Sequence, residues 1–191
     1  MRTIRIFLAS SSELKADRES FEIEINRKNK LLAEKEIFLH LDIWEDLPTH
    51  MSQTRSQDEY NKQIGAADMF VLLAWNKVGK FTEEEFDVAY RQFRDKKKPS
   101  IFTWFKEPPQ AAEPSLDQFK KKLAGLGHFP ALYSDAADLW VQFNKELDRL
   151  DLAGMGKIDD TAGIYVDNRG ANIKNQFNGG VFNNPTFQGG A

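Results

Sequence analysis

The chain has 191 residues, a net charge of −3 and a pI of about 5.7, which leaves room for one ordinary domain plus an appendage and does not favour nucleic-acid binding. It contains no Cys, which excludes disulfides, a thiol nucleophile and thiolate metal ligands, and its three His residues are too scattered in sequence to form a metal motif. No apolar run is long enough to cross a membrane and no signal-peptide pattern opens the sequence, so we expect a cytoplasmic protein without a membrane span.

The first 152 residues alternate short apolar runs with stretches of helical spacing. The apolar runs predict five strands, at Ile4–Ala9, Ile37–Ile43, Met69–Trp75, Ser100–Phe105 and Pro130–Tyr133. The other stretches predict helices from the Ser10–Ser12 cap through Leu32, from Asp58 to Ala67, from a Thr82 cap to Lys98, from Ser115 to Leu126 and from Ala136 to Leu152. This alternation predicts an α/β fold with a five-stranded parallel sheet and helices on both faces.

In such a fold, the loops that leave the carboxyl ends of the strands line the ligand-binding edge. The first of these loops holds Ser10, Ser11 and Ser12, whose hydroxyls and backbone N–H groups at a helix N-terminus suit a phosphate group. Simple N-capping, which needs only one Ser, explains the same residues equally well. The sequence has neither GxGxxG nor GxxxxGK[ST], which argues against a Rossmann dinucleotide site and P-loop chemistry.

Two tryptophans, Trp44 and Trp75, stand at the ends of predicted strands. If their rings face the ligand-binding edge, they would stack on an adenine or nicotinamide ring. If their rings are buried, they would only fill the core. Asp46 belongs to an acidic group beside Trp44, which either forms a polar wall for the ligand or is solvated loop charge. Gly79, in the loop after Trp75, completes the candidate substrate-binding residues.

An acidic triplet, Glu83–Glu85, opens the helix that follows the predicted central strand. For Glu83 and Glu84 the simplest explanation is compensation of the helix dipole. Glu85 is expected one turn into the helix, close to Trp75 and the ligand-binding edge. A carboxylate in that place can bind ribose hydroxyls or stabilise an oxocarbenium ion, the transition-state type of glycoside cleavage.

The segments IRIFLASSSELKADR, IWEDLP, SQDEYNKQI, MFVLLAWNKVGKFTEEEFDVAYRQF and KKPSIFTWF together resemble TIR-like domains of bacterial defence proteins, over roughly residues 1–150. The resemblance implies a flavodoxin-like fold and NAD glycohydrolase activity, which cleaves the bond between nicotinamide and ribose. NAD would be the substrate, with no permanently bound cofactor and no metal. In TIR enzymes a Glu opens the helix after the third strand, with a small residue four positions later, and Glu85 and Ala89 match this spacing.

By this resemblance Glu85 is the catalytic carboxylate, and Glu84 is the substitute because the triplet leaves the register open. The Ser10–Ser12 loop would contact phosphate or ribose, and three further residues would surround the base and ribose: Trp44, Asp46 and Trp75.

Two features depart from the TIR pattern. Phe81 and Thr82 stand where TIR domains usually have Trp and a small residue, and THMSQTRSQ replaces the usual Gly-rich stretch after the second strand. Two alternatives therefore stay open. One is a non-enzymatic TIR-like signalling module, and the other is a nucleoside deoxyribosyltransferase-like hydrolase.

From Gly163 onward the sequence is rich in Asn and Gly with isolated large apolar residues, and the FNGG at 177–180 returns as FQGG at 187–190. Gly and Asn disfavour helix, while spaced apolar residues flanked by Asn suit stacked β-arcs with Asn ladders. The segment 163–191 is therefore predicted to mediate cross-β assembly, or else to be a disordered extension. The residues expected to carry assembly are Ile173, Asn175, Phe177, Val181, Phe182 and Phe187.

This tail resembles bacterial amyloid signalling motifs, in which the motif of an effector is templated by a matching motif on a nucleotide-binding sensor. The TIR resemblance implies self-association as well, because a neighbouring subunit typically completes a TIR active site. The sequence thus predicts a bacterial immune effector that hydrolyses NAD when oligomerised. Its parts would be a TIR-like domain at 1–152, a flexible linker at 153–162 and an assembly motif at 163–191.

Overall fold

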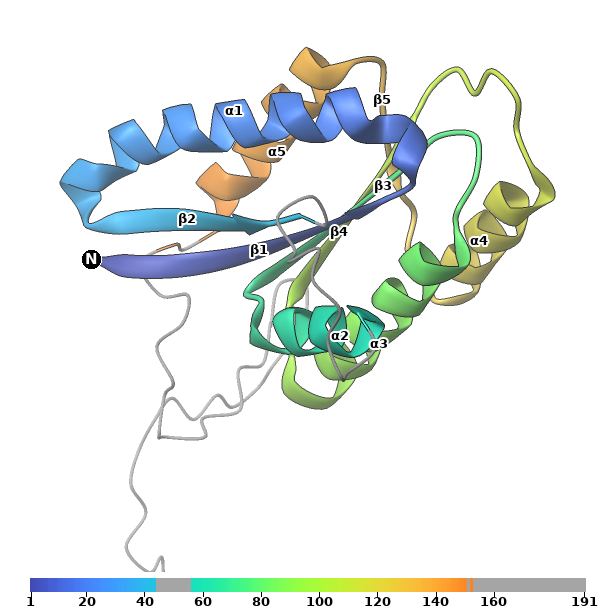
Figure 1. The fold of residues 1–191 in the computed structure, drawn as a ribbon, viewed down its shortest axis with the longest axis horizontal. Coiled ribbons are helices and arrows are strands. Elements are labelled where there is room, and N and C mark those ends of the chain that lie inside the picture. The colour runs from blue at the N-terminus through green and yellow to red at the C-terminus, as the bar shows by residue number, and fades with distance from the viewer. Residues whose placement is uncertain (44–55, 151, 153–191) are drawn as a thin grey trace, which may run out of the picture. The chain divides into compact units, whose positions relative to one another are not determined.

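Five parallel strands form a sheet in the part of the chain that the structure describes (Figure 1). The computed structural model describes residues 1–43, 56–150 and 152, which belong to a unit that runs from Met1 to Gly156. The strands are β1 (Arg2–Ser10), β2 (Ile37–Asp42), β3 (Met69–Ala74), β4 (Ser100–Lys106) and β5 (Ala131–Tyr133). Their order across the sheet is β2-β1-β3-β4-β5, the flavodoxin-like arrangement. The predicted parallel α/β sheet is confirmed.

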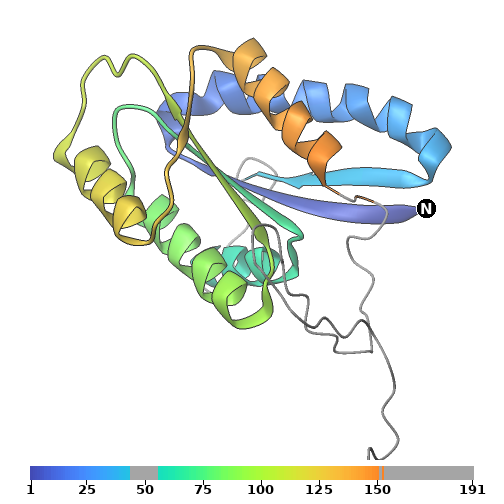
Figure 2. The same cartoon turned by 180° about the vertical axis from the view of Figure 1, so that it is seen from behind.

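Helices cover both faces of the sheet. On one face lie α1 (Lys15–Leu32) and α5 (Ala136–Arg149), and on the other lie α2 (Ser56–Ala66), α3 (Lys80–Lys96) and α4 (Pro114–Gly125), as Figures 1 and 2 show from two sides. Two short 3-10 turns, at Ser12–Leu14 and Ala33–Lys35, flank α1. Every described helix thus falls where the sequence predicted one, with ends shifted by a few residues.

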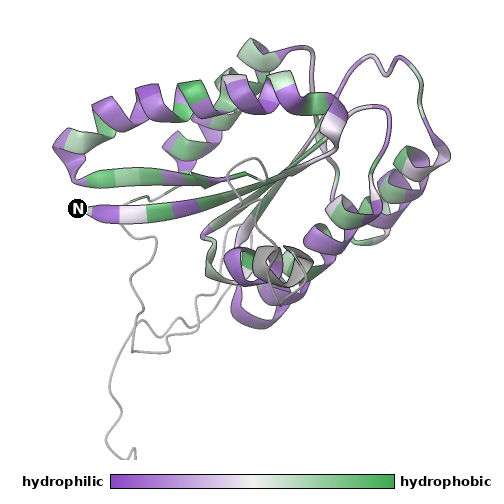
Figure 3. Cartoon of the chain, in the orientation of Figure 1, coloured by the Kyte–Doolittle hydropathy of each residue, from purple (hydrophilic) through white to green (hydrophobic). Residues whose placement is uncertain are grey.

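Two apolar clusters, one on each face of the sheet, form the core. All six residues of β3 are buried, as expected for the central strand of a parallel sheet. Figure 3 shows that the strands at the centre of the sheet are largely hydrophobic. On the first face, side chains such as Ile6 and Val71 pack with Phe21 and Phe143 from α1 and α5. The cluster on the second face joins alternate sheet residues to the inward sides of α2, α3 and α4. The strands therefore form a rigid platform for the loops at their carboxyl ends.

The prediction that Thr82 caps α3 is wrong. The helix begins at Lys80 with Gly79 as its N-cap, in an extended conformation at φ −70° and ψ 156°. Thr82 lies in the first turn with its side chain buried, because the apolar stripe of α3 starts there rather than after the acidic triplet. The consequence for the site is that Glu85 lies further inside the helix than the cap at Thr82 implied.

The parallel arrangement places the carboxyl ends of β1, β3, β4 and β5 side by side. Ser10 pairs with Leu73 across β1 and β3, and Lys106 pairs with Tyr133 across β4 and β5. The loops after β1 and β3 therefore meet at one edge of the sheet, where the sequence predicted ligand binding. Within the described ranges, no helix is long and apolar enough to span a membrane.

Candidate active site

Glu85 is the most unusual charged residue near this edge. Its side chain belongs to the buried face of α3, together with Thr82, Phe86 and Ala89, and Glu85 is only 8% exposed. Burial raises the pKa of the Glu85 carboxyl to about 8, and the neighbouring charge of Glu84 adds to the increase. In the part of the chain that the structure describes, Glu85 receives no hydrogen bond and forms no ion pair. The fold thus holds an uncompensated carboxyl at the inner surface of a helix.

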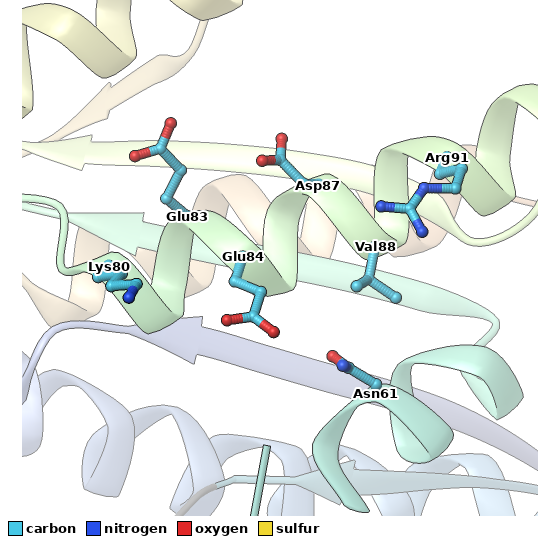
Figure 4. Close-up of a pocket in the computed structure, with 7 residues that line it drawn as sticks. All are labelled: Asn61, Lys80, Glu83, Glu84, Asp87, Val88 and Arg91. Carbon is cyan, nitrogen blue, oxygen red and sulfur yellow. The ribbon is translucent and has the colours of Figure 1, made fainter. Parts of the chain in front are cut away.

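The other two members of the triplet have different surroundings. Lys122 of α4 forms ion pairs with Glu83 at 2.8 Å and with Asp87 at 2.6 Å, which anchors α4 to α3. Glu84 lines an open hollow between α2 and α3, and Figure 4 shows it on the side of α3 that faces Asn61. Glu83 therefore has a structural partner, whereas Glu84 stays close to Glu85 and remains the substitute candidate.

The hollow beside Glu84 is polar and mixed in charge. It is lined by side chains of α2 and α3: Asn61, Lys80, Glu83, Glu84, Asp87, Val88 and Arg91. These α3 residues recur at helical spacing on the outer surface of the helix, whereas Glu85 lies on its buried face. Among the residues described, no group of three or more acidic or His side chains is placed to hold a metal ion.

The serine loop after β1 is held in place by internal contacts. The Ser10 hydroxyl accepts a hydrogen bond from the buried Arg18 guanidinium at 2.5 Å, and the Ser11 hydroxyl donates to Glu13 at 3.0 Å. Ser11 precedes a 3-10 turn without capping it through its side chain, and Ser12 is exposed. Two of the three hydroxyls predicted to bind phosphate are thus engaged within the protein, and the Ser12 hydroxyl faces solvent.

Glu13 connects the loop after β1 to the loop after β3. Its carboxylate accepts hydrogen bonds from the backbone N–H of Asn76 at 3.0 Å, the Asn76 side chain at 3.1 Å and the backbone N–H of Lys77 at 3.3 Å. The side-chain carbonyl oxygen of Asn76 in turn accepts hydrogen bonds from the backbone N–H groups of Gln110 and Ala111. These contacts fix the relative positions of three edge loops.

Trp75 lies half-buried at the same edge. Its indole N–H donates to the Pro108 carbonyl at 2.9 Å, and the Lys106 ammonium lies 5.0 Å from its ring centre. Gly79 is half-buried and serves as the N-cap of α3. Trp75 packs against the apolar cluster on the face of the sheet that α1 and α5 cover, whereas Glu85 belongs to α3 on the other face, so the expected proximity of these two residues is not found. Within the described ranges, Ser10, Ser11 and Trp75 make no hydrogen bond to Glu85.

Sequence reasoning missed a buried ion pair beneath this edge. Asp17 of α1, which is 4% exposed, accepts two hydrogen bonds of 3.0 Å from the Lys106 ammonium of β4. Asp17 and Arg18 lie three and four residues after the buried Leu14. In an amphipathic helix these positions face the core and normally carry apolar residues. Charged residues at core-facing positions were the signal that these side chains are buried and paired.

The other predicted site residues lie outside the described part of the chain. They comprise two candidates for the base and ribose, Trp44 and Asp46, and the proposed linker and assembly residues from 153 onward.

Comparisons with known proteins give the chain no family. No family model matches it, and no curated protein matches it. Among solved structures, a conserved protein from Enterococcus faecalis V583 is similar at 14% sequence identity and a TM-score of 0.44. The match covers 75% of this chain and 99% of that one.

Proposed function

We propose that this protein cleaves the bond between nicotinamide and ribose in NAD, with Glu85 as the catalytic carboxylate. The observation that carries the proposal is the burial of Glu85 without a compensating partner among the described residues. An ionisable group whose pKa is strongly raised by burial, beside the ligand-binding edge of a parallel sheet, is typical of a catalytic site. The TIR resemblance of the sequence around Glu85 and Ala89 supplies the reaction type.

The chemistry suits a carboxylate in a site of low polarity. In NAD the bond from ribose C1′ to the pyridinium nitrogen breaks, and nicotinamide leaves as a neutral molecule that keeps the bonding electron pair. The positive charge moves to the ribose as an oxocarbenium ion, which a carboxylate stabilises. Water then adds at C1′ and loses a proton, so that the products are nicotinamide, ADP-ribose and one proton.

The protonation state of Glu85 links substrate binding to this chemistry. With a pKa of about 8 the carboxyl is mostly neutral in the free protein at pH 7. A positive charge nearby favours the ionised form and lowers that pKa. The pyridinium of NAD is such a charge, so NAD binding favours loss of the Glu85 proton and formation of the carboxylate that the transition state requires.

Assembly through the segment 163–191 provides the switch. Both apolar clusters lie within the first 152 residues, so a chain that ends before residue 163 keeps its core. Stacking of tails raises the local concentration of attached domains, and a site completed by a neighbouring copy then becomes active. Deleting 163–191 is expected to leave a folded domain with greatly reduced NAD consumption. Full specific activity of the truncated protein at low concentration would contradict the switch.

The test of the activity is to incubate the full chain with NAD at low and high protein concentration, with and without preformed fibrils of a 163–191 peptide. Release of nicotinamide together with ADP-ribose, stimulated by concentration or fibrils, is the expected result. No nicotinamide release under any of these conditions would favour the non-enzymatic signalling module. Cleavage of free nucleosides in preference to NAD would favour the deoxyribosyltransferase-like hydrolase.

A further inference from the structure

A buried tyrosine at the end of β5 has a hydroxyl without a hydrogen-bonding partner. Tyr133 is 1% exposed, and within the described ranges its hydroxyl neither donates nor accepts a hydrogen bond. Burial raises the pKa of the hydroxyl, and the charges of Asp17 and Glu13 add to the increase, so the group keeps its proton and remains a donor. A buried donor without an acceptor costs stability and therefore calls for an explanation.

A second donor lies beside this hydroxyl. Lys106 and Tyr133 are paired in register at the ends of β4 and β5, on strands about 4.8 Å apart. Both side chains lie on the sheet face that α1 and α5 cover, because Tyr133 packs in the apolar cluster of that face and Lys106 reaches Asp17 of α1. The backbone N–H of Glu107 donates to the Tyr133 carbonyl at 2.9 Å and fixes the two strand ends. The two side chains are therefore held next to each other.

The Lys106 ammonium has one N–H group left for a further acceptor. An ammonium has three donors, and its hydrogen bonds of 3.0 Å to the two Asp17 oxygens use two of them. The Trp75 ring, 5.0 Å away, attracts the positive charge without offering an oxygen. The Lys106 side chain is 22% exposed, so this donor can be reached from solvent. A single carbonyl oxygen, which has two lone pairs, can accept from both Lys106 and Tyr133.

Asp17 supplies an acceptor at the same place. A carboxylate has about four lone-pair sites, and the Lys106 ammonium uses two of those on Asp17. An anion is disfavoured here because the negative charges of Asp17 and Glu13 already act on the Tyr133 hydroxyl. A group with donors alone would leave both Tyr133 and Lys106 without an acceptor. The complementary group thus has an acceptor oxygen, a donor nitrogen and no net charge.

We propose that Tyr133, Lys106 and Asp17 form a binding site for a small neutral carboxamide. The amide oxygen accepts hydrogen bonds from the Tyr133 hydroxyl and the Lys106 ammonium, and the amide N–H donates to Asp17. The site lies on the face of the sheet that α1 and α5 cover, whereas Glu85 belongs to α3 on the other face. It is therefore separate from the proposed catalytic carboxylate and does not depend on NAD cleavage.

Three probes of the same shape test the charge and the hydrogen-bonding pattern. Acetamide carries the neutral amide, acetate has two acceptor oxygens and a negative charge, and acetamidinium has only donors and a positive charge. Their affinities for the full chain are measured by saturation-transfer NMR. Acetamide is expected to bind at least about tenfold more tightly than either ion. Glycylglutamine, which carries the same amide on a peptide, then shows whether a protein side chain is a second source of this group.

Removal of one hydroxyl tests the role of Tyr133. Tyr133→Phe keeps the ring in the core and should weaken acetamide binding about tenfold, because a hydrogen bond to the amide oxygen is lost. Tyr90→Phe is the matched control, because Tyr90 is half-buried on α3, on the other face of the sheet, and should leave the affinity unchanged.

Urea unfolding gives a second readout that needs no ligand. Because the Tyr133 hydroxyl lacks a partner in the free protein, Tyr133→Phe should unfold at the same urea concentration as the wild type or at a higher one. A residue whose removal preserves or raises stability while it weakens binding has a function rather than a structural role. A lower midpoint would show that the hydroxyl already has a partner in the folded protein and would overturn the inference.

Other results would also overturn it. They are no binding of acetamide, equal affinity for the three probes, or unchanged acetamide affinity in folded Tyr133→Phe. A crystal structure grown with acetamide would contradict the site as well if the Tyr133 hydroxyl held an ordered water that acetamide does not displace. Failure to cleave NAD would refute the proposed function and leave this site intact, because none of its three side chains takes part in that reaction.

Discussion

Asp17 on α1 and Glu85 on α3, both buried carboxyl groups of the described residues, have opposite electrostatic surroundings. Asp17 is 4% exposed and Glu85 is 8% exposed, so burial alone does not distinguish them. Asp17 has the Lys106 ammonium at 3.0 Å from both of its oxygens, whereas Glu85 has no cation among the described residues. A paired buried charge is explained by structure, while an unpaired one costs stability and calls for a functional explanation.

The largest difference between the two sites should appear in the pH dependence of stability. The pKa of Glu85 is raised from 4.5 to about 8, so the carboxyl is neutral in both folded and unfolded states below pH 4.5. As the pH rises, the unfolded state loses this proton first, and the stability of the folded state falls until the pH passes about 8. Gln is neutral throughout, so Glu85→Gln should be more stable than wild type at pH 9 by about 4–5 kcal/mol and similar at pH 4.

Urea unfolding at the two pH values measures this difference. Glu84→Gln is the matched control, because Glu84 is half-buried on the outer surface of the same helix. A constant difference between wild type and Glu85→Gln at both pH values would mean that the Glu85 carboxyl is not held in an apolar, unpaired environment.

The opposite effect is expected for Asp17. Asp17→Asn leaves the Lys106 ammonium, whose side chain is 22% exposed, without its carboxylate. Removing one partner of a buried ion pair typically costs 3–5 kcal/mol, and the partial exposure of Lys106 places the expected loss at about 3 kcal/mol. Urea unfolding at pH 7 checks this value, and the double variant Asp17→Asn, Lys106→Met should recover part of it. A loss below about 0.5 kcal/mol would show that the pair does not stabilise the fold.

A smaller effect concerns the pH dependence of catalysis. Because the ionised form of Glu85 is the reactive one, kcat/KM for NAD should rise about tenfold per pH unit below 8 and level off above it. Asp17→Asn should lower the amount of folded protein without moving this profile. A profile that is flat from pH 6 to pH 9 would exclude an ionisation of Glu85 from the rate.

The sequence was sufficient for the fold because apolar runs and helical spacing repeat in strict alternation. Met69–Trp75, the most apolar run, is the central strand β3, although the strand ends at Ala74. The predicted N-terminus of α3 was wrong, because Thr is a residue type that favours the N-cap but Thr82 lies in the buried stripe of the helix. Local propensity suggests caps, but the tertiary packing of the helix decides which residue is covered.

The site was less accessible from sequence because pairing depends on residues far apart in the chain. Glu13 is hydrogen-bonded to Asn76, which lies 63 positions away in the sequence, and Asp17 is paired with Lys106, which lies 89 positions away. The sequence singles out Glu85 only by its position in the helix, and the packing of α3 against α4 and the sheet is what gives Glu83 an ion-pair partner and buries Glu85. The predicted roles of Trp44, Asp46 and the tail fall outside the described residues and stay predictions.

The most direct test of the central claim is the rate of nicotinamide release from NAD by the wild type, Glu85→Gln and Glu84→Gln, measured at pH 8 on assembled full-length protein. Glu85→Gln should lower the rate roughly a thousandfold while the protein stays folded and assembled, because it removes the carboxylate that stabilises the transition state. Glu84→Gln should retain most of the activity. Release at the wild-type rate by folded Glu85→Gln would contradict the assignment of Glu85 as the catalytic residue.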